Sequence, residues 1–394
     1  MHDDLFPDSD PADEDIEDAR ASAADLRNAV LYNTDWTVET IVNQVKKGRI
    51  DLTPAFQRRD AWTLKAKSLL IESILLNFPI PPITLAEKPE DKTFVVVDGK
   101  QRLTAITQFV GGLSGTKSNN FILTGLSQLN HLNGKDYSAL SENYPREAVS
   151  LENYSIRTNV IRGWKNDDIL YSIFHRLNSG SVKLSPQELR QSLHPGPFAK
   201  FINEYSETSA ALRDIFPGQE PDFRMRDVEL VTRYLSLYFF IEKYAGNLKS
   251  HLDNTVNTFN NSWDNYEHDI MRALDRFEKG YSASVKVFGR EHVFKKWNEE
   301  GWGTRTNRAI FDAIMFNLIF DNVLVAFENR APDILLAFQA ASLEDEFRES
   351  VERTTKTAEA LYKRISILSE NFSLIGVDSP KIEFVNNRIF VVKK

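Results

Sequence analysis

Apolar and polar positions follow different patterns in the two halves of the chain. Up to about residue 190, short apolar runs of strand length alternate with segments whose apolar residues recur at helical spacing, and beyond that point helical spacing dominates. The pattern predicts an α+β fold in which a mixed α/β domain over residues 35–190 precedes a mainly α-helical domain over residues 191–394.

The N-terminal domain carries the clearest local signals. Thr37 is a candidate N-cap, and Phe94-Val95-Val96-Val97 is apolar throughout, which predicts a strand buried on both faces. Ser185-Pro186-Gln187-Glu188 predicts a helix start, because serine caps, proline suits the first helical position and the glutamate reaches back to free N–H groups. We expect ordered structure to begin at Asp35. We predict helices over 38–47, 65–77 and 103–110 and strands over 83–86, 94–97 and 155–161.

Three long helices are predicted in the C-terminal domain, over 228–244, 308–327 and 344–371. The chain ends with a segment over 382–392 that Asn386-Asn387 interrupts, which favours a hairpin because asparagine tolerates the positive φ of tight turns. Trp297 and Trp302 flank a polar tetrapeptide and are candidates either to stack on a nucleic-acid base or to pack in the core.

Composition limits the class of protein. Hydrophobic residues make up 42% and charged residues 26%, a balance typical of globular proteins, and the absence of cysteine excludes disulfides, thiolate zinc sites and a cysteine nucleophile. No apolar run approaches the ~18–20 residues of a membrane span, and the acidic start is unlike a secretion signal. We therefore expect a cytoplasmic protein without a membrane partner.

The net charge of −8 is located at one end of the chain. The first 30 residues hold ten acidic residues and two arginines, so that the remainder is neutral. This composition predicts an acidic, disordered leader over 1–34. Proteins that hold DNA by bulk charge show a basic excess, so any contact with DNA must come from a local patch here.

The segment Asp98-Gly99-Lys100-Gln101-Arg102 is the strongest candidate for chemistry, because it joins the buried strand to the next helix. Gly99 permits a sharp turn and a close approach of the main chain to a ligand, and the N–H groups of the helix start face the same point. Lys100 and Arg102 supply cations, while Asp98 is able to hold Mg²⁺ or orient a water that Gln101 helps to position. These features suit a polyphosphate. A plain strand–turn–helix with a capping aspartate is the alternative.

Two further clusters contain residue types that bind phosphate. Gln57 and Arg58 lie on an extended segment and could hydrogen-bond phosphate oxygens, or form a surface stretch paired with nearby acids. Arg176 is a candidate third cation, and Asn178 suits either the site or the end of a helix.

Together these segments resemble the N-terminal half of GmrSD-type modification-dependent restriction enzymes, a bacterial family whose signature is Ile/Val-Asp-Gly-Gln-Gln-Arg-Leu-Thr. Proteins of phosphorothioation-sensing phage defence carry it too. The matching segments are Phe56-Gln57-Arg58, Val97 to Thr104 and Phe174 to Asn178, with looser matches at 224–229 and 305–308.

The resemblance implies a ParB/sulfiredoxin-like α/β domain that binds and hydrolyses a nucleoside triphosphate with Mg²⁺ or another divalent cation. Lys100 departs from the family, which usually has glutamine there, and a lysine is a point charge rather than an amide that both donates and accepts. The implied catalytic residues are Asp98, Gln101 and Arg102, with Asp98 as the metal ligand. The implied nucleotide-binding residues are Gln57, Arg58, Gly99, Lys100, Thr104, Arg176 and Asn178.

The function implied is that of a sensor or regulatory subunit in a bacterial anti-phage or modification-dependent restriction system. Two-domain relatives append a nuclease with histidine-based metal chemistry, and the seven histidines of this chain are scattered without that pattern. We therefore expect DNA and a separately encoded nuclease or effector subunit as partners, and a homo-oligomer stays open. The alternatives are a non-catalytic DNA-binding or assembly module and, with few clustered metal ligands to support it, a stand-alone metal-dependent nuclease.

Overall fold

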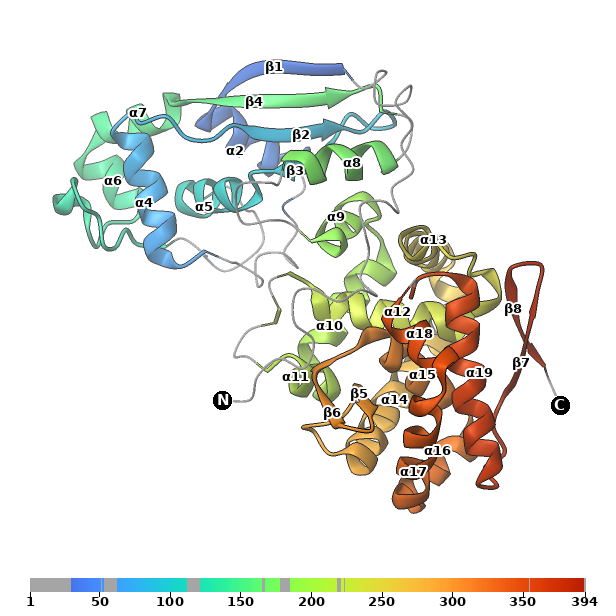
Figure 1. Cartoon of the computed structure of the whole chain (residues 1–394). Coiled ribbons are helices and arrows are strands. Elements are labelled where there is room, and N and C mark those ends of the chain that lie inside the picture. The colour runs from blue at the N-terminus through green and yellow to red at the C-terminus, as the bar shows by residue number, and fades with distance from the viewer. Residues whose placement is uncertain are drawn as a thin grey trace. The chain divides into compact units, whose positions relative to one another are not determined.

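The computed structural model describes residues 30–50, 52, 62–111, 121–164, 167–177, 185–217, 221–222, 224–353 and 355–392, with the backbone alone for 174–177. The predicted leader falls largely outside these residues. The chain folds as two compact units that divide between Leu193 and His194 (Figure 1). The first unit is mixed α/β and the second is mainly helical, as the pattern of apolar positions predicts.

A four-stranded sheet with the order β1-β4-β2-β3 forms the centre of the N-terminal unit. β1 (Val30–Thr37) pairs antiparallel with β4 (Ser155–Arg162), β4 pairs parallel with β2 (Ile83–Glu87), and β2 pairs antiparallel with β3 (Phe94–Asp98). The first described strand thus includes Val30 to Thr34, which precede the predicted start of ordered structure at Asp35. The sequence analysis misses the start of β1 because an edge strand exposed on both faces shows no apolar alternation.

Helices provide a hydrophobic core on each face of this sheet. The first core takes residues from α2 (Val38–Lys46), α4 (Leu64–Leu75), α5 (Lys100–Val110), α6 (Tyr137–Asn143) and α7 (Pro145–Asn153). The second takes residues from α8 (Asp167–Leu177) and α9 (Pro186–Leu193), which both pack on β3. Phe94 and Val96 belong to the first core, and Val95 and Val97 to the second. The predicted burial of this strand on both faces is therefore confirmed.

Local capping signals are also confirmed. Thr37 Oγ1 accepts a hydrogen bond from Thr40 N at 3.1 Å. At α9, Ser185 Oγ accepts from Glu188 N at 3.1 Å, and Glu188 Oε2 accepts from Ser185 N at 2.7 Å. The side chains thus satisfy backbone donors that a helix start leaves free.

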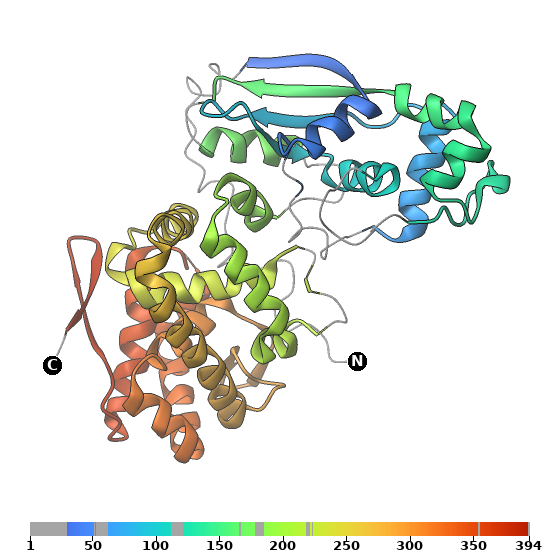
Figure 2. The same cartoon turned by 180° about the vertical axis from the view of Figure 1, so that it is seen from behind.

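The C-terminal unit is built from ten α-helices within the described residues (Figures 1 and 2). They are α10 (Pro197–Thr208), α11 (Ala210–Ile215), α12 (Arg226–Phe240), α13 (Leu248–Asn261), α14 (Trp263–Phe288), α15 (Arg308–Asn317), α16 (Asp321–Asn329), α17 (Ala331–Leu343), α18 (Asp345–Glu352) and α19 (Ala358–Leu374). Two hairpins accompany them: β5 (Lys295–Asn298) with β6 (Gly301–Thr306), and β7 (Lys381–Val385) with β8 (Arg388–Val392). The second confirms the predicted C-terminal hairpin, with φ of 51° at Asn386 and 60° at Asn387.

Two helix predictions are wrong, because each of these segments forms two helices rather than one. The segment 308–327 splits into α15 and α16, because Arg276 of α14 donates to Leu318 O at 2.7 Å and to Ile319 O at 2.9 Å and so takes carbonyl groups that a continuous helix would use. The segment 344–371 splits into α18 and α19, where Thr357 caps the second helix. No single helix among the described residues has the length and apolar composition of a membrane span. Only α15 and α16 taken together have both, and the two helices are bent by 106° relative to each other.

Glu72 of α4 holds the loop that precedes α6. Its Oε1 accepts from Gln128 N at 2.7 Å and from Leu129 N at 2.8 Å, and its Oε2 accepts from both N and Oγ of Ser127 at 3.1 Å. Burial raises the pKa of Glu72, but the backbone N–H groups of Leu129, Gln128 and Ser127 together lower it by more, so the pKa lies below its ordinary value. The carboxylate therefore stabilises the folded unit.

We expect Glu72→Gln to lower the free energy of unfolding by about 2–3 kcal/mol at pH 7, because the amide NH₂ would face backbone donors and leave them unpaired. A lowered folded-state pKa means that this stabilisation is complete above the unfolded-state pKa, about 4.3, and is lost as the pH falls through the folded-state pKa. Urea denaturation should therefore show a large difference in the free energy of unfolding between variant and wild type at pH 7 and a small difference at pH 3. The exposed Glu90→Gln is the control. An equal gap at both pH values would contradict this account.

Candidate functional site

The predicted site lies where β3 passes into α5. Asp98 ends the strand, and Gly99 is the N-cap of the helix with φ of 94°, in the left-handed region. The backbone conformation favours glycine here, and a Cβ atom on Gly99 would be tightly placed, 3.1 Å from Ile83 Cγ1 and 3.2 Å from Arg102 Nη2. The helix begins at Lys100 rather than at Leu103. The cations at 100 and 102 therefore lie on its first turn.

Asp98 is oriented by two donors from this turn. Its Oδ1 accepts from Gly99 N at 2.7 Å, and its Oδ2 accepts from Arg102 Nη2 at 3.0 Å. The Asp98 side chain keeps 25% of its surface exposed, whereas that of Arg102 keeps 9%. Because each carboxylate oxygen has two lone pairs, Asp98 retains acceptor capacity toward solvent.

Arg102 also connects the helix start to the chain before β2. Its Nη2 donates to Pro82 O at 3.0 Å as well as to Asp98. The guanidinium is thus partly engaged by the protein itself. Its Nε is buried and has no hydrogen-bond partner among the described residues, and the same holds for Oε1 of the neighbouring Gln101. A buried polar atom without any partner costs about 1–3 kcal/mol, so a water molecule or a ligand would stabilise both atoms. Gln44 Oε1 and Arg364 Nε are in the same state elsewhere in the described part of the chain.

Lys100 is directed toward α9. Its Nζ lies 3.2 Å from Glu188 Oε1, and the two side chains are only 8% and 5% exposed. The sequence analysis expects this ammonium at a phosphate, yet in the structure it neutralises a buried carboxylate. A glutamine at this position could donate the same hydrogen bond without the charge.

The other predicted residues are spread more widely. Thr104 is buried in the second turn of α5, and Arg176 belongs to the last turn of α8. Gln57, Arg58 and Asn178 lie outside the described residues. The structure therefore brings Asp98, Gly99, Gln101 and Arg102 together and joins Lys100 to Glu188.

The sequence analysis does not find two partners of this site. Glu188 is predicted there only as a capping residue, and Pro82 is not singled out. Nothing local in the sequence pairs either with α5, because Lys100 and Glu188 are 88 positions apart and Arg102 and Pro82 are 20 apart. Within the described part of the chain, no group of three or more His, Asp or Glu side chains is arranged to hold a metal ion. A cation at the turn would be held by Asp98 together with oxygens of its ligand and water.

Comparison with known families supplies one match. Residues 38–195 match the family described as GmrSD restriction endonuclease, N-terminal domain, over a stretch shorter than half of the chain. No curated protein and no solved structure matches the chain. The matched stretch contains the Asp98 turn, the Lys100–Glu188 ion pair and both helices that pack on the second face of β3. This part of the protein is similar to the N-terminal domain of GmrSD restriction endonucleases.

Proposed function

We propose that this protein is a component of a bacterial restriction system that binds and hydrolyses a nucleoside triphosphate with Mg²⁺ at the Asp98 turn. The similarity of residues 38–195 to a restriction-endonuclease domain supports the class of system. By the same resemblance we propose a ParB/sulfiredoxin-like arrangement for the sheet and its helices.

The observation that carries the nucleotide site is the pair of unpartnered buried atoms beside Asp98. Among the residues that the structure describes, Arg102 Nε has no acceptor and Gln101 Oε1 has no donor. Both belong to the first turn of α5, where free backbone N–H groups and the positive end of the helix dipole favour an anion. A phosphate oxygen would satisfy the arginine, and a water molecule would satisfy the glutamine.

The roles follow from these positions. Asp98, partly exposed and held by two donors, is suited to bind Mg²⁺, which when bound would neutralise charge on the phosphates. Gln101 orients the water that attacks the γ-phosphate, and Arg102 stabilises the charge of the transferred group. Positioning and charge neutralisation supply most of the catalysis in such a site.

The remaining roles belong to the helical unit and to other subunits. We infer that the helical unit senses DNA or a partner subunit and that DNA is cut by a separately encoded nuclease or effector. The state of nucleotide at Asp98 would then regulate that effector.

A second candidate is a non-catalytic DNA-binding or assembly module. The bonds of Lys100 to Glu188 and of Arg102 to Pro82 and Asp98 favour it, because both cations already have partners in the fold. In this case the turn binds nucleotide without turnover, or only stabilises the unit.

The test is phosphate release by the full-length protein with each of the four nucleoside triphosphates, with and without Mg²⁺ and DNA. Calorimetry with a non-hydrolysable triphosphate runs in parallel. We expect Mg²⁺-dependent release with at least one nucleotide. Binding without release would select the non-catalytic module, and the absence of both would refute the nucleotide site.

A further inference from the structure

A second candidate site lies in the helical unit, in a pocket between the β5–β6 hairpin and α18. The pocket has a volume of about 330 Å³, within the range of small-molecule sites. Ile310, Phe347 and Val351 line it with apolar side chains that are almost fully buried.

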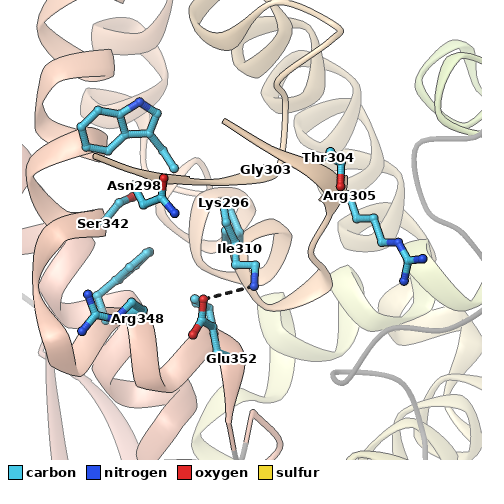
Figure 3. A pocket seen from close by; sticks show the side chains of 12 residues that line it. Lys296, Asn298, Gly303, Thr304, Arg305, Ile310, Ser342, Arg348 and Glu352 are labelled. Carbon is cyan, nitrogen blue, oxygen red and sulfur yellow. Dashed lines mark hydrogen bonds and ion pairs between the residues drawn. The ribbon is translucent and has the colours of Figure 1, made fainter. Parts of the chain in front are cut away.

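Charged side chains surround this apolar floor. Three cations line the pocket, Lys296, Arg305 and Arg348, against the single carboxylate of Glu352. Lys296 Nζ lies 3.1 Å from Glu352 Oε1, and the two face one another in Figure 3, with Arg348 on one side of them and Arg305 on the other. The pocket thus carries a local positive excess in a chain whose net charge is −8. An anionic ligand is favoured.

Arg305 is the cation most available to such a ligand. Arg348 forms an ion pair with Asp345, and Lys296 is paired with Glu352. Arg305 is exposed, and its guanidinium forms no hydrogen bond or ion pair within the part of the chain that the structure describes. A guanidinium in this state is well suited to a phosphate, which it can bind through two parallel hydrogen bonds.

The two tryptophans of the hairpin have different surroundings. They are cross-strand partners and both are half-buried, but among the described residues ring contacts are formed by Trp302: its ring stacks on Phe338 at 6.0 Å and 12°, with His292 at 4.9 Å. Trp297 lines the pocket and has no ring contact among the residues described. The partly exposed Trp297 side chain thus borders the pocket without an aromatic neighbour, whereas Trp302 packs on other rings.

We propose that this pocket binds one nucleotide unit of a single-stranded nucleic acid, with the base against Trp297 and the adjoining phosphates at Arg305 and Arg348. Aromatic stacking beside cations is the usual way in which proteins hold single strands. Glu352 and Asn298 supply hydrogen-bonding groups for the edge of a base, which a purely carboxylate ligand such as an acidic peptide would not use. The proposal gives the DNA contact of the proposed function a place in the fold and rests on that function only for the choice of DNA.

The test measures binding of a fluorescein-labelled 12-nucleotide DNA to the full-length protein by anisotropy, without nucleoside triphosphate. We expect Trp297→Ala to weaken binding about 5- to 100-fold through the loss of stacking, and Trp297→Phe to retain most of it. Arg305→Ala should reduce the slope of log K against log salt by about 0.7, the value for one phosphate of a single strand. The matched control is Arg272→Ala, which removes an exposed arginine of α14 far from the pocket in sequence and is expected to change neither quantity.

Three competitors identify the ligand: deoxyadenosine monophosphate, the same sequence as a duplex, and a polyglutamate peptide. The proposal expects the unlabelled single strand to compete best. It is overturned if the wild type does not bind the single strand, if neither Trp297→Ala nor Arg305→Ala alters binding, or if polyglutamate or the free mononucleotide competes better than the strand. Because Asp98→Asn should leave strand binding intact, failure at the triphosphate site and failure at this pocket are separate results.

Discussion

Asp312→Asn is expected to lower the free energy of unfolding of the helical unit by about 3–5 kcal/mol, the largest stability effect that we predict. Asp312 of α15 accepts from Arg233 Nε and Nη2 of α12, both at 2.6 Å, and from Arg364 Nη2 of α19 at 3.0 Å. All three side chains are at most 3% exposed. Burial lowers the pKa of Arg364, and the Asp312 carboxylate opposes this effect. An asparagine would remove the negative charge that both guanidinium groups share in the core.

Urea denaturation followed by near-ultraviolet circular dichroism measures this effect. Asp269→Asn is the matched control, because Asp269 forms an exposed ion pair with Arg272 on α14, and exposed pairs contribute about 1 kcal/mol or less. A cost for Asp312→Asn no larger than that of the control would show that the three helices do not depend on this carboxylate.

Asp98→Asn is expected to reduce phosphate release at least 100-fold, which corresponds to about 2.7 kcal/mol of transition-state stabilisation. The amide oxygen can still accept from Gly99 N, so the turn should survive, but an amide lacks the charge that a divalent cation and the Arg102 guanidinium require. This variant is preferable to Arg102→Ala, because removing the arginine also breaks its bond to Pro82 O. Steady-state phosphate release and thermal unfolding are measured on the same preparation.

Asp91→Asn controls for the removal of a carboxylate from the same strand pair. Asp91 lies in the connection between β2 and β3, is exposed, and accepts from Thr93 N at 2.9 Å. Its replacement should leave phosphate release unchanged. If Asp98→Asn released phosphate as fast as the control, the proposed roles at the turn would be wrong.

Several elements of both units follow from local sequence. The β3 strand, the Gly99 turn, the caps at Thr37 and Ser185 and the hairpin at Asn386-Asn387 are all predicted and found. The caps and the turns depend on backbone sterics or on hydrogen bonds between residues at most four positions apart, and β3 is marked by an unbroken apolar run. A short window of sequence contains each of these signals. The start of the edge strand β1 and the β5–β6 hairpin lack such a signal, and the sequence analysis does not predict them.

The candidate site likewise combines contacts that local sequence predicts with contacts that depend on tertiary packing. Local sequence brings Asp98, Gly99, Gln101 and Arg102 to one point, since a strand, a glycine turn and a helix leave little freedom over five residues. It could not indicate that Lys100 meets Glu188, because that contact depends on how α9 packs on β3. Lys100, whose side chain is of a type suited to phosphate, therefore forms an ion pair with Glu188 in the structure.

By itself, the sequence determined the two-part α+β organisation, the elements with strong periodicity and the place where a carboxylate, a glycine and an arginine meet. Only the tertiary structure decided where the long helices break, which carboxylates the buried cations contact and which of the two hairpin tryptophans lines a pocket. The reason is physical: local conformation depends on neighbouring residues, whereas the partner of a long charged or aromatic side chain depends on which elements pack against it.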